Sequence, residues 1–460
     1  MASEAKPARS LWSSKWAFVL AAAASAVGLG NLWRFPYLAA KYGGGTFLIT
    51  YVVLVFTVGI SLLLLETALG RHTRQSVIGA FSHFGKKYKF IGILATLVPF
   101  IITPYYCIIG GWVTKYMTAY ITNAAGTLAD GGEYFTAFIE SPVSSFIFMA
   151  IFMLIAFVIV ALGVKGGIEK ANLVMMPVLV VMSIGIAIFT LTMPGAAEGA
   201  AYYLIPDFSK FSPELVIGAL GQMFYSLSLA MAIMITYGSY VEKQSDLTVS
   251  AGRIAGFDLG ISFFAGLMIV PAAFVAMGSG AAVAEHSGPS LMFVILPEVF
   301  NNMGPVANII GFLFFLLVLF AALTSAISLT EACTSIVSDG TGWSRKKSVI
   351  VTGAIVFVAG IIINAGYNGL SFIQPLGEGT TILDFADFIS NSVLMPIVAL
   401  LTCIFVGWII KPQVLIDEIR VSSKFKLANA WAVMIKYIAP VLIVVILVAY
   451  VGATFGIFSF

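Results

Sequence analysis

Long apolar stretches alternate with short polar connections along almost the whole chain. An α-helix needs about 17 to 25 residues to cross a bilayer core, and each stretch is at least that long. The eleven predicted spans are 16–40, 46–70, 90–121, 143–163, 168–193, 213–240, 250–278, 306–337, 349–365, 382–410 and 432–457. The pattern therefore predicts an all-α polytopic membrane protein with eleven transmembrane helices, and a lipid bilayer as its surroundings.

Composition supports this prediction and excludes other classes. Hydrophobic residues make up 60% of the 460 residues and charged residues only 10%, whereas soluble domains carry about 25% charged residues. So little charge is not enough to cover a water-exposed surface. A soluble globular protein, a disordered chain and a nucleic-acid-binding protein are excluded.

The charged loops predict an orientation. Most of the 24 Lys and Arg residues fall on one set of alternate loops, and cytoplasmic loops are the ones enriched in these residues. They are Lys6, Arg9, Lys15, Arg71, Arg74, Lys86, Lys87, Lys89, Lys165, Lys170, Lys243, Arg253, Arg345, Lys346, Lys347, Lys411, Arg420, Lys424 and Lys426. The opposite loops hold only Lys41 and Lys210. We therefore expect a cytoplasmic N-terminus and an extracellular C-terminus.

Asp258 lies at an unusual depth for a carboxylate. It comes about eight residues into its predicted span, hence roughly 12 Å from the cytoplasmic edge at 1.5 Å per residue, and half the bilayer core is about 15 Å. Counted in the same way, Ser226, Thr324 and Ser325 lie at the same depth. An ionisable group inside the membrane is by default a sign of a functional site.

The first span contains a sequence that suits a continuous membrane helix poorly. Its residues 25–36 read SAVGLGNLWRFP. A break there would free backbone carbonyls for a cation and amides for an anion, which is tolerated at depth where the backbone lines a cavity. The alternative is close helix packing through the two glycines.

Oxygen donors at this depth are of the kind that Na⁺ prefers. Asn31, Ser226, Thr324 and Ser325 carry amide or hydroxyl oxygens, and Asp258 adds a carboxylate. Hard cations take several such oxygen ligands. For each Ser or Thr alone, the alternative is a hydrogen bond to its own helix.

Several motifs together resemble the neurotransmitter:sodium symporter family, in its bacterial amino-acid transporter branch. The segment 28–36 (GLGNLWRFP) is similar to the first-helix signature, 221–228 (GQMFYSLS) to the sixth-helix break and 323–325 (LTS) to the eighth-helix sodium motif. The segment 66–71 (ETALGR) and the pair at 105–106 also fit. The resemblance extends in order from about residue 12 to residue 410.

The resemblance implies two inverted five-helix repeats, with helices 1 and 6 broken at mid-membrane. This family is itself a well-known example of inverted repeats in secondary transporters, and the expected fold is carried over from it. The segments are then 1–15 (cytoplasmic, inner gate), 16–193 (first repeat), 194–212 (extracellular loop), 213–410 (second repeat), 411–431 (cytoplasmic loop) and 432–460 (eleventh helix). A prokaryotic inner membrane is the implied location.

The resemblance also implies two Na⁺ sites and a substrate site. The first Na⁺ would be held by Ala26, Asn31, Ser226 and Asp258, and the second by Ala24, Val27, Ala321, Thr324 and Ser325. The substrate would contact Ala26, Leu29, Gly30, Ile102, Tyr106, Tyr225, Ser226, Ser228, Met231, Ser325 and Leu329. Its carboxylate would complete the first Na⁺ site.

Two gates are implied at opposite ends of the substrate path. Arg34 and Asp387 would close the outer side. The inner side would be closed by Arg9 with Asp339, supported by Trp12 and Tyr240. Exposed ion pairs are weak, which suits a gate that must open.

Two positions refine the implied substrate and ions. Gly28 stands where monoamine carriers of the family have Asp, so the substrate must bring its own carboxylate, and the apolar pocket favours neutral, hydrophobic amino acids. Asp258 stands where chloride-dependent members have Asn, so a fixed charge replaces chloride. The implied function is Na⁺-coupled, chloride-independent amino-acid import by alternating access.

Other functions remain as alternatives at this point. A proton-coupled amino-acid carrier of the same fold is the main one, and it would not need Thr324 and Ser325 as a pair. Within the Na⁺ symporter itself, protonation of Asp258 on the return step would add proton antiport. A channel or receptor would bind an amino acid without concentrating it. An enzyme is not expected, because no metal cluster or nucleophile motif is present. The preferred amino acid, the ion stoichiometry and the oligomeric state stay open.

Overall fold

The computed structural model describes residues 10–122, 128, 131–277, 289–301 and 303–457. Within these residues the protein is built from helices, and the sole β-type contact is an isolated bridge between Gly44 and Pro206. The predicted all-α fold is confirmed.

The helices of the first half are α1 (Lys15–Ala26), the π-helix η1 (Gly30–Arg34), α2 (Phe35–Lys41), α3 (Gly45–Leu54), η2 (Val55–Gly59), α4 (Ile60–Thr73), α5 (Val77–Ser82), η3 (Lys86–Tyr88), α6 (Lys89–Ile121), α8 (Gly131–Glu140), α9 (Pro142–Ala161), η4 (Val164–Glu169), α10 (Lys170–Leu191) and α11 (Ala196–Leu204). The second half contains η5 (Phe208–Lys210), α12 (Pro213–Ser226), α13 (Ile233–Gly238), α14 (Leu247–Met277), η6 (Leu291–Ile295), α16 (Leu296–Asn301), η7 (Gly304–Val306), α17 (Ala307–Thr341), α18 (Arg345–Ala365), α19 (Ile382–Asp387), η8 (Phe388–Leu394), α20 (Met395–Ile404), η9 (Phe405–Ile409), α21 (Gln413–Arg420), α22 (Ala428–Val433), η10 (Met434–Ile438) and α23 (Ala439–Thr454).

Most predicted spans correspond to uninterrupted helical segments. Nine segments of the described chain are long and apolar enough to cross a membrane, and α1 with the segment Gly30–Lys41, bent by 48°, makes a tenth. The predicted span 213–240 consists of two helices, α12 and α13, each too short to cross by itself. The count of eleven crossings stays a prediction that treats α12 and α13 as one broken span.

Several helices begin earlier than the hydropathy pattern predicts. The span predicted at 90–121 is helical from Lys86, and the one predicted at 349–365 begins at Arg345. Hydropathy marks only the apolar part of a helix, whereas Lys and Arg lie along its end and extend their charges into water. The loop predicted at 411–431 contains the short helix α21.

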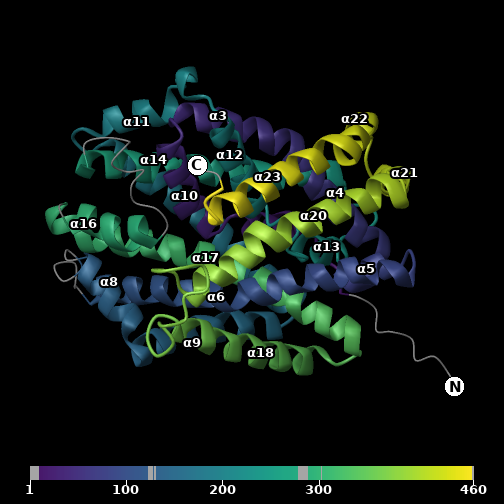
Figure 1. Cartoon of the computed structure of the whole chain (residues 1–460), viewed down its shortest axis with the longest axis horizontal. Coiled ribbons are helices and arrows are strands. Elements are labelled where there is room, and N and C mark those ends of the chain that lie inside the picture. The colour runs from purple at the N-terminus through teal and green to yellow at the C-terminus, as the bar shows by residue number, and fades with distance from the viewer. Residues whose placement is uncertain (1–9, 123–127, 129–130, 278–288, 302, 458–460) are drawn as a thin grey trace.

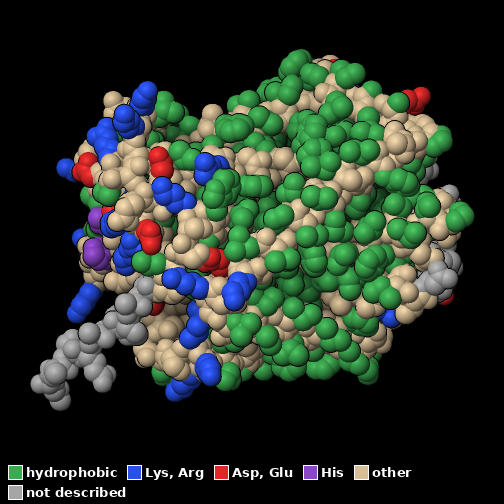
Figure 2. Space-filling view, turned by 180° about the vertical axis from the view of Figure 1, so that it is seen from behind, with side chains coloured by type: hydrophobic (Ala, Val, Ile, Leu, Met, Phe, Trp, Pro, Cys, Tyr) green, Lys and Arg blue, Asp and Glu red, His purple; other side chains and the backbone are tan. Residues whose placement is uncertain are grey.

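The helices lie side by side in one elongated bundle (Figure 1). The connecting helices α8, α11 and α16 lie at one end, and α5 and α21 lie at the other. Figure 2 shows Lys and Arg side chains gathered at the end of α5 and α21, beside a broad hydrophobic surface. We call this end the basic end. Its charge matches the loops predicted to be cytoplasmic.

Small side chains place α1 at the centre of the bundle. Ala21, Ala22, Ala23 and Ala24 are all fully buried, and α1 packs against α10, α14 and α17. Small residues allow helix backbones to approach closely where the lipid supplies no hydrophobic driving force. This central part of α1 is therefore surrounded by protein.

Two glycines hold α4 and α13 in direct backbone contact. A Cβ atom on Gly70 would lie 2.0 Å from the carbonyl oxygen of Ile235, and one on Gly238 would lie 2.4 Å from that of Thr67. No larger residue fits at either position without moving a backbone. The helices α4 and α13 therefore form one unit.

This contact predicts the effect of Gly70→Ala. We expect the added methyl group to push α13 away from α4 and to destabilise the protein by about 1 to 3 kcal/mol, as overpacking does. Gly252→Ala in α14 is the matched control, because a Cβ atom there meets no atom within 4 Å. Thermal unfolding of both variants in detergent measures the difference, and equal melting temperatures would contradict the prediction.

Candidate functional site

Two helix breaks meet near the middle of the bundle. The helix α1 ends at Ala26, Val27 is extended (φ −80°, ψ 99°), and helical structure resumes at Gly30. The break after α12 contains Ser228, Ala230 and Ala232, whose φ angles of 52°, 59° and 61° are left-handed. Residues with a Cβ adopt this conformation at a cost. The surrounding structure must therefore hold the second break in place.

Glu66 of α4 is one group that holds this break. Its carboxylate accepts a hydrogen bond of 2.7 Å from the backbone amide of Ala230. Gln222 joins the two breaks, because its side-chain amide donates to the carbonyl of Gly30 at 2.9 Å. No role for Gln222 was predicted from the sequence, and its position on the buried face of α12 was the available signal.

Two residues predicted for the first Na⁺ site, Asn31 and Ser226, contact a third, the fully buried Asp258. The Asn31 side-chain amide donates to Asp258 Oδ1 at 2.7 Å and to Ser226 Oγ at 2.9 Å. Ser226 Oγ donates to the same carboxylate oxygen at 2.5 Å, and Ala26 ends the neighbouring helix α1. The cluster places one carboxylate and several neutral oxygen atoms at the junction of the two breaks.

Two members of this cluster were missed from sequence. Tyr51 Oη donates to Asp258 Oδ2 at 2.9 Å, and Ser262 Oγ accepts from the Asn31 amide at 2.8 Å. Ser262 follows Asp258 by four residues on one helix, so the helical period indicated that the two share a face. For Tyr51 no local pattern gave a signal.

A second oxygen cluster lies between α1 and α17. Thr324 Oγ1 lies 3.0 Å from the carbonyl oxygen of Ala321 and 3.5 Å from that of Val27. Ser325 Oγ instead donates to the carbonyl of Ser25 at 3.1 Å. Of the predicted set, Val27, Ala321 and Thr324 are in contact. Ala24 is fully buried on α1, and no contact joins its carbonyl to this cluster among the described hydrogen bonds.

All eleven predicted substrate residues line one small cavity. They are Ala26, Leu29, Gly30, Ile102, Tyr106, Tyr225, Ser226, Ser228, Met231, Ser325 and Leu329, and Ser25, Gly28 and Ile233 join them. The cavity has a volume of about 20 Å³, close to the space that one water molecule needs. An amino acid requires more room, so these side chains must move apart to admit one.

Tyr106 and Gly28 limit this cavity. The Tyr106 hydroxyl accepts a hydrogen bond of 3.3 Å from the Leu29 amide. A Cβ atom on Gly28 would lie 2.5 Å from Ser325 Oγ and 3.0 Å from the Tyr106 hydroxyl. Glycine at position 28 therefore keeps the space between these hydroxyl groups open.

A larger cavity of about 340 Å³ lies on the other side of Tyr225, away from the basic end. Tyr225, Leu29 and Gly30 line both cavities. Arg34 and Asp387 line the larger one, but the described ion pairs do not include them. The Arg34 guanidinium donates to Tyr450 Oη at 3.3 Å, and Asp387 accepts from Asn391 at 2.5 Å.

The path toward the basic end is closed by aromatic side chains. Trp12 donates through its indole to the carbonyl of Tyr237 at 3.2 Å and through its backbone amide to that of Tyr240 at 3.1 Å. The Tyr240 hydroxyl donates to Glu331 at 2.6 Å, and Glu331 pairs with Arg345 at 2.5 Å. Trp12 and Tyr240 thus lie where the inner gate was predicted.

The predicted pair of Arg9 and Asp339 is described only in part. Arg9 lies outside the described residues. Asp339 Oδ2 accepts a hydrogen bond of 2.7 Å from the backbone amide of Ser76, which precedes α5. The pairing of Glu331 with Arg345 was not predicted, although both residue types are rare inside apolar segments.

The chemistry of these clusters suits a hard cation. Within the described residues, no group of three His, Cys, Asp or Glu side chains comes together. The donors are one carboxylate with hydroxyl, amide and carbonyl oxygens, which are ligands of hard cations.

Comparison with known proteins identifies the class of this fold and site. Residues 9–128 and 138–455 match the model of the sodium:neurotransmitter symporter family. The chain belongs to this family. It is a transporter and not an enzyme, and it is a Na⁺-coupled symporter.

Individual relatives cover nearly the whole chain. An uncharacterized sodium-dependent transporter of Bacillus subtilis, YhdH, is 34% identical over 459 residues, which cover 98% of this chain and 99% of the relative. The human sodium- and chloride-dependent GABA transporter 2 is 28% identical over 77% of this chain and 67% of its own length. The crystal structure of MhsT in complex with L-phenylalanine superposes with a TM-score of 0.86 at 35% identity, covering 96% of this chain and 100% of MhsT.

Proposed function

We propose that this symporter imports neutral, hydrophobic amino acids together with Na⁺ and without chloride. The observation that carries the proposal is Asp258, a fully buried carboxylate at the junction of two helix breaks, whose hydrogen-bond partners among the described residues are all neutral. A buried anion without a cationic partner is costly. Na⁺ bound among these oxygens would supply the missing positive charge, and Asp258 would do what chloride does in other carriers.

The wall of the small cavity supports the proposed substrate class. The described residues that line it are glycines or residues with apolar or hydroxyl-bearing side chains, and none of them carries a charge. A charged substrate side chain would therefore lack a partner. The substrate carboxylate would lie near the amides of Leu29 and Gly30 and the Tyr106 hydroxyl. L-phenylalanine bound to MhsT is of the same chemical class.

Two Na⁺ sites follow from the two oxygen clusters. The first would use Ala26, Asn31, Ser226 and Asp258, with the substrate carboxylate as a further ligand. In this cluster the Asn31 amide nitrogen faces the oxygens, so the amide would have to turn its oxygen toward the ion. The second would use Ala24, Val27, Ala321, Thr324 and Ser325. Because one ion and the substrate share a contact, each would strengthen binding of the other.

The two closures would give alternating access. In this conformation the path toward the basic end is closed by Trp12, while Arg34 and Asp387 stand apart on the wall of a cavity at the other side. Closing that cavity would bring Arg34 and Asp387 together, and release of Trp12 would open the other path. We propose that the basic end is cytoplasmic, the C-terminus extracellular and the location the cell membrane.

Uptake into proteoliposomes tests the function directly. We expect labelled neutral hydrophobic amino acids to accumulate above the outside concentration with an inward Na⁺ gradient and not with K⁺. Replacing chloride by gluconate should leave uptake unchanged. Uptake driven by a proton gradient without Na⁺ would favour the proton-coupled alternative, and a large loss without chloride would contradict the fixed-charge argument.

Asp258→Ala tests the first Na⁺ site. We expect Na⁺ to lose its effect on amino-acid binding. The amino-acid affinity measured in Na⁺ should therefore fall by about 5- to 150-fold, the usual size of such a coupling. Equilibrium binding in Na⁺ and in K⁺ measures it. Asp207→Ala is the control, because the Asp207 carboxylate bonds only to the nearby Ser209 among the described contacts. Unchanged Na⁺ dependence in Asp258→Ala would refute the assigned site.

Gly28→Asp tests the position of the substrate. The new carboxylate would crowd Ser325 and Tyr106 and repel the substrate carboxylate, so amino-acid affinity should fall. Gly28→Ala adds the crowding without the charge and should cost less. Affinities measured by competition with a labelled amino acid separate the two effects, and an affinity that is unaltered in the Asp variant would count against the proposed pose.

A further inference from the structure

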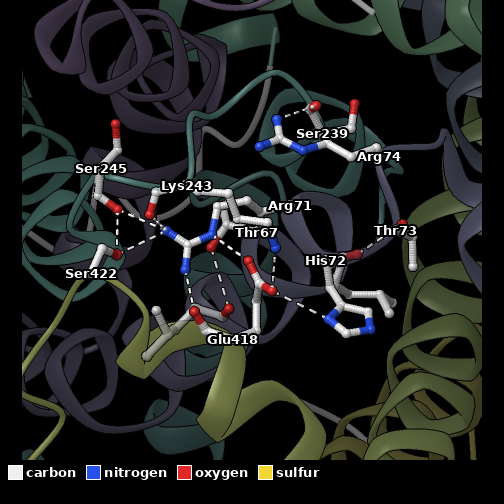
Figure 3. A network of polar contacts seen from close by, with 12 residues as sticks. Thr67, Arg71, His72, Thr73, Arg74, Ser239, Lys243, Ser245, Glu418 and Ser422 are labelled. Carbon is white, nitrogen blue, oxygen red and sulfur yellow. Dashed lines mark hydrogen bonds and ion pairs between the residues drawn. The ribbon is translucent and has the colours of Figure 1, made fainter.

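A charged cluster at the basic end lies outside the site described above (Figure 3). Its centre is Arg71, in the last turn of α4, whose side chain is fully buried. The Arg71 guanidinium donates to the Glu418 carboxylate at 2.8 Å and also to the Glu418 carbonyl. It further donates to the Ser245 carbonyl at 2.8 Å and to Ser422 Oγ at 2.9 Å. A buried guanidinium needs such partners.

Glu418 of α21 is the acidic partner in this cluster. Its second carboxylate oxygen lies 2.5 Å from Lys243 Nζ and 3.3 Å from His72 Nδ1. Burial raises the pKa of Glu418, but hydrogen bonds from His72 and Lys243 and the charges of Arg71 and Lys243 outweigh this effect and lower its pKa to about 2. The carboxylate is therefore ionised at neutral pH, and its counter-charge for Arg71 is lost only as the pH falls toward 2.

The cluster holds the segment 239–246, which connects α13 to α14. Arg71 bonds to the carbonyl of Ser245, and Arg74 donates to that of Ser239 at 3.2 Å. Ser423, just after α21, donates to the Asp246 carboxylate at 2.5 Å. The segment 239–246 is thus fastened along its length both to α4 and to the region around α21.

The same segment receives Trp12. The carbonyl of Tyr240, within the segment, accepts from the Trp12 backbone amide, and the carbonyl of Tyr237, just before it, accepts from the Trp12 indole. The aromatic closure at the basic end therefore rests on backbone carbonyls whose position depends on the segment 239–246. Ser239, Ser245 and Asp246 of this segment are bonded to the charged cluster and its neighbours. Tyr240 of the same segment is bonded to Trp12.

We propose that Glu418 is a positioning residue for this closure. Through Arg71 and Lys243 it fixes the segment 239–246 so that Trp12 can dock, and it favours the conformation that is closed at the basic end. The inference rests on the proposed function in one respect, namely that this closure opens during transport. Because α4 and α13 form one unit, Glu418 joins that unit to the connection between the tenth and eleventh predicted spans.

Labelling of two reporter cysteines tests the proposal in the full chain reconstituted in proteoliposomes. Cys107, Cys333 and Cys403 are first replaced by Ser. The first reporter replaces Ser335, which is hydrogen-bonded to the Tyr240 hydroxyl, and the second replaces Ser392, which lines the larger cavity. With Glu418→Gln we expect the Ser335→Cys reporter to react roughly tenfold faster with a water-soluble maleimide, as a 1.4 kcal/mol shift gives, and the Ser392→Cys reporter to react more slowly.

Asp417→Asn is the matched control on the same helix. Asp417 is exposed and bonds to Gln413 of its own helix among the described contacts, so neither reporter should change. If Glu418→Gln folds poorly, Lys243→Gln removes one partner of the Glu418 carboxylate from a side chain that is 43% exposed. It should shift both reporters in the same directions by a smaller factor.

The outcomes separate a positioning role from a merely structural one. If Glu418→Gln speeds both reporters together, Glu418 only stabilises the fold and the proposal is wrong; unchanged rates at both sites would also overturn it. Failure of the proposed transport function would give a different result: without the Glu418 substitution, both reporters would be labelled at the same rate in Na⁺ and in K⁺. The comparison of Glu418→Gln with Asp417→Asn in K⁺ would still decide the role of Glu418.

Discussion

At membrane depth, every charged or freed backbone group needs a partner inside the protein, because lipid offers none. The rest of the structure depends on this constraint. Breaking two helices frees amides and carbonyls, and Glu66, Gln222 and Tyr106 take up several of them. The side chains of Asn31, Ser226 and Tyr51 bond to Asp258 near the junction of the breaks. The same constraint that makes the breaks costly therefore concentrates polar oxygens at one place.

Close packing of small residues makes this arrangement possible. Four alanines bury α1 among its neighbours, and Gly70 and Gly238 bring α4 against α13. In lipid such contacts replace the hydrophobic effect as the source of helix association. They also define which parts move together, since a pair of helices in backbone contact cannot slide without separating. The carboxylate of Glu66 on α4 then supports the break that precedes α13.

The two ends of the substrate path are built from different interactions. At the basic end, Trp12 is bonded to backbone carbonyls, and Glu331 and Glu418 each form an ion pair with an arginine. At the other end, Arg34 and Asp387 are each engaged with a neutral partner across a cavity. The difference in stability between the two closures would determine which end is open when no ligand is bound.

The sequence by itself determined the class of protein and most of the candidate site. Apolar stretches long enough to cross a bilayer leave no other fold class, and Asp258 and the segment 28–36 stand out because their chemistry is costly in lipid. Tertiary structure alone decided the rest. Tyr51, Gln222, Glu418 and the pairing of Glu331 with Arg345 act through contacts between segments far apart in the chain. The local sequence shows that a polar residue is energetically costly at its depth in the membrane. Which residue it bonds to depends on how the helices pack together.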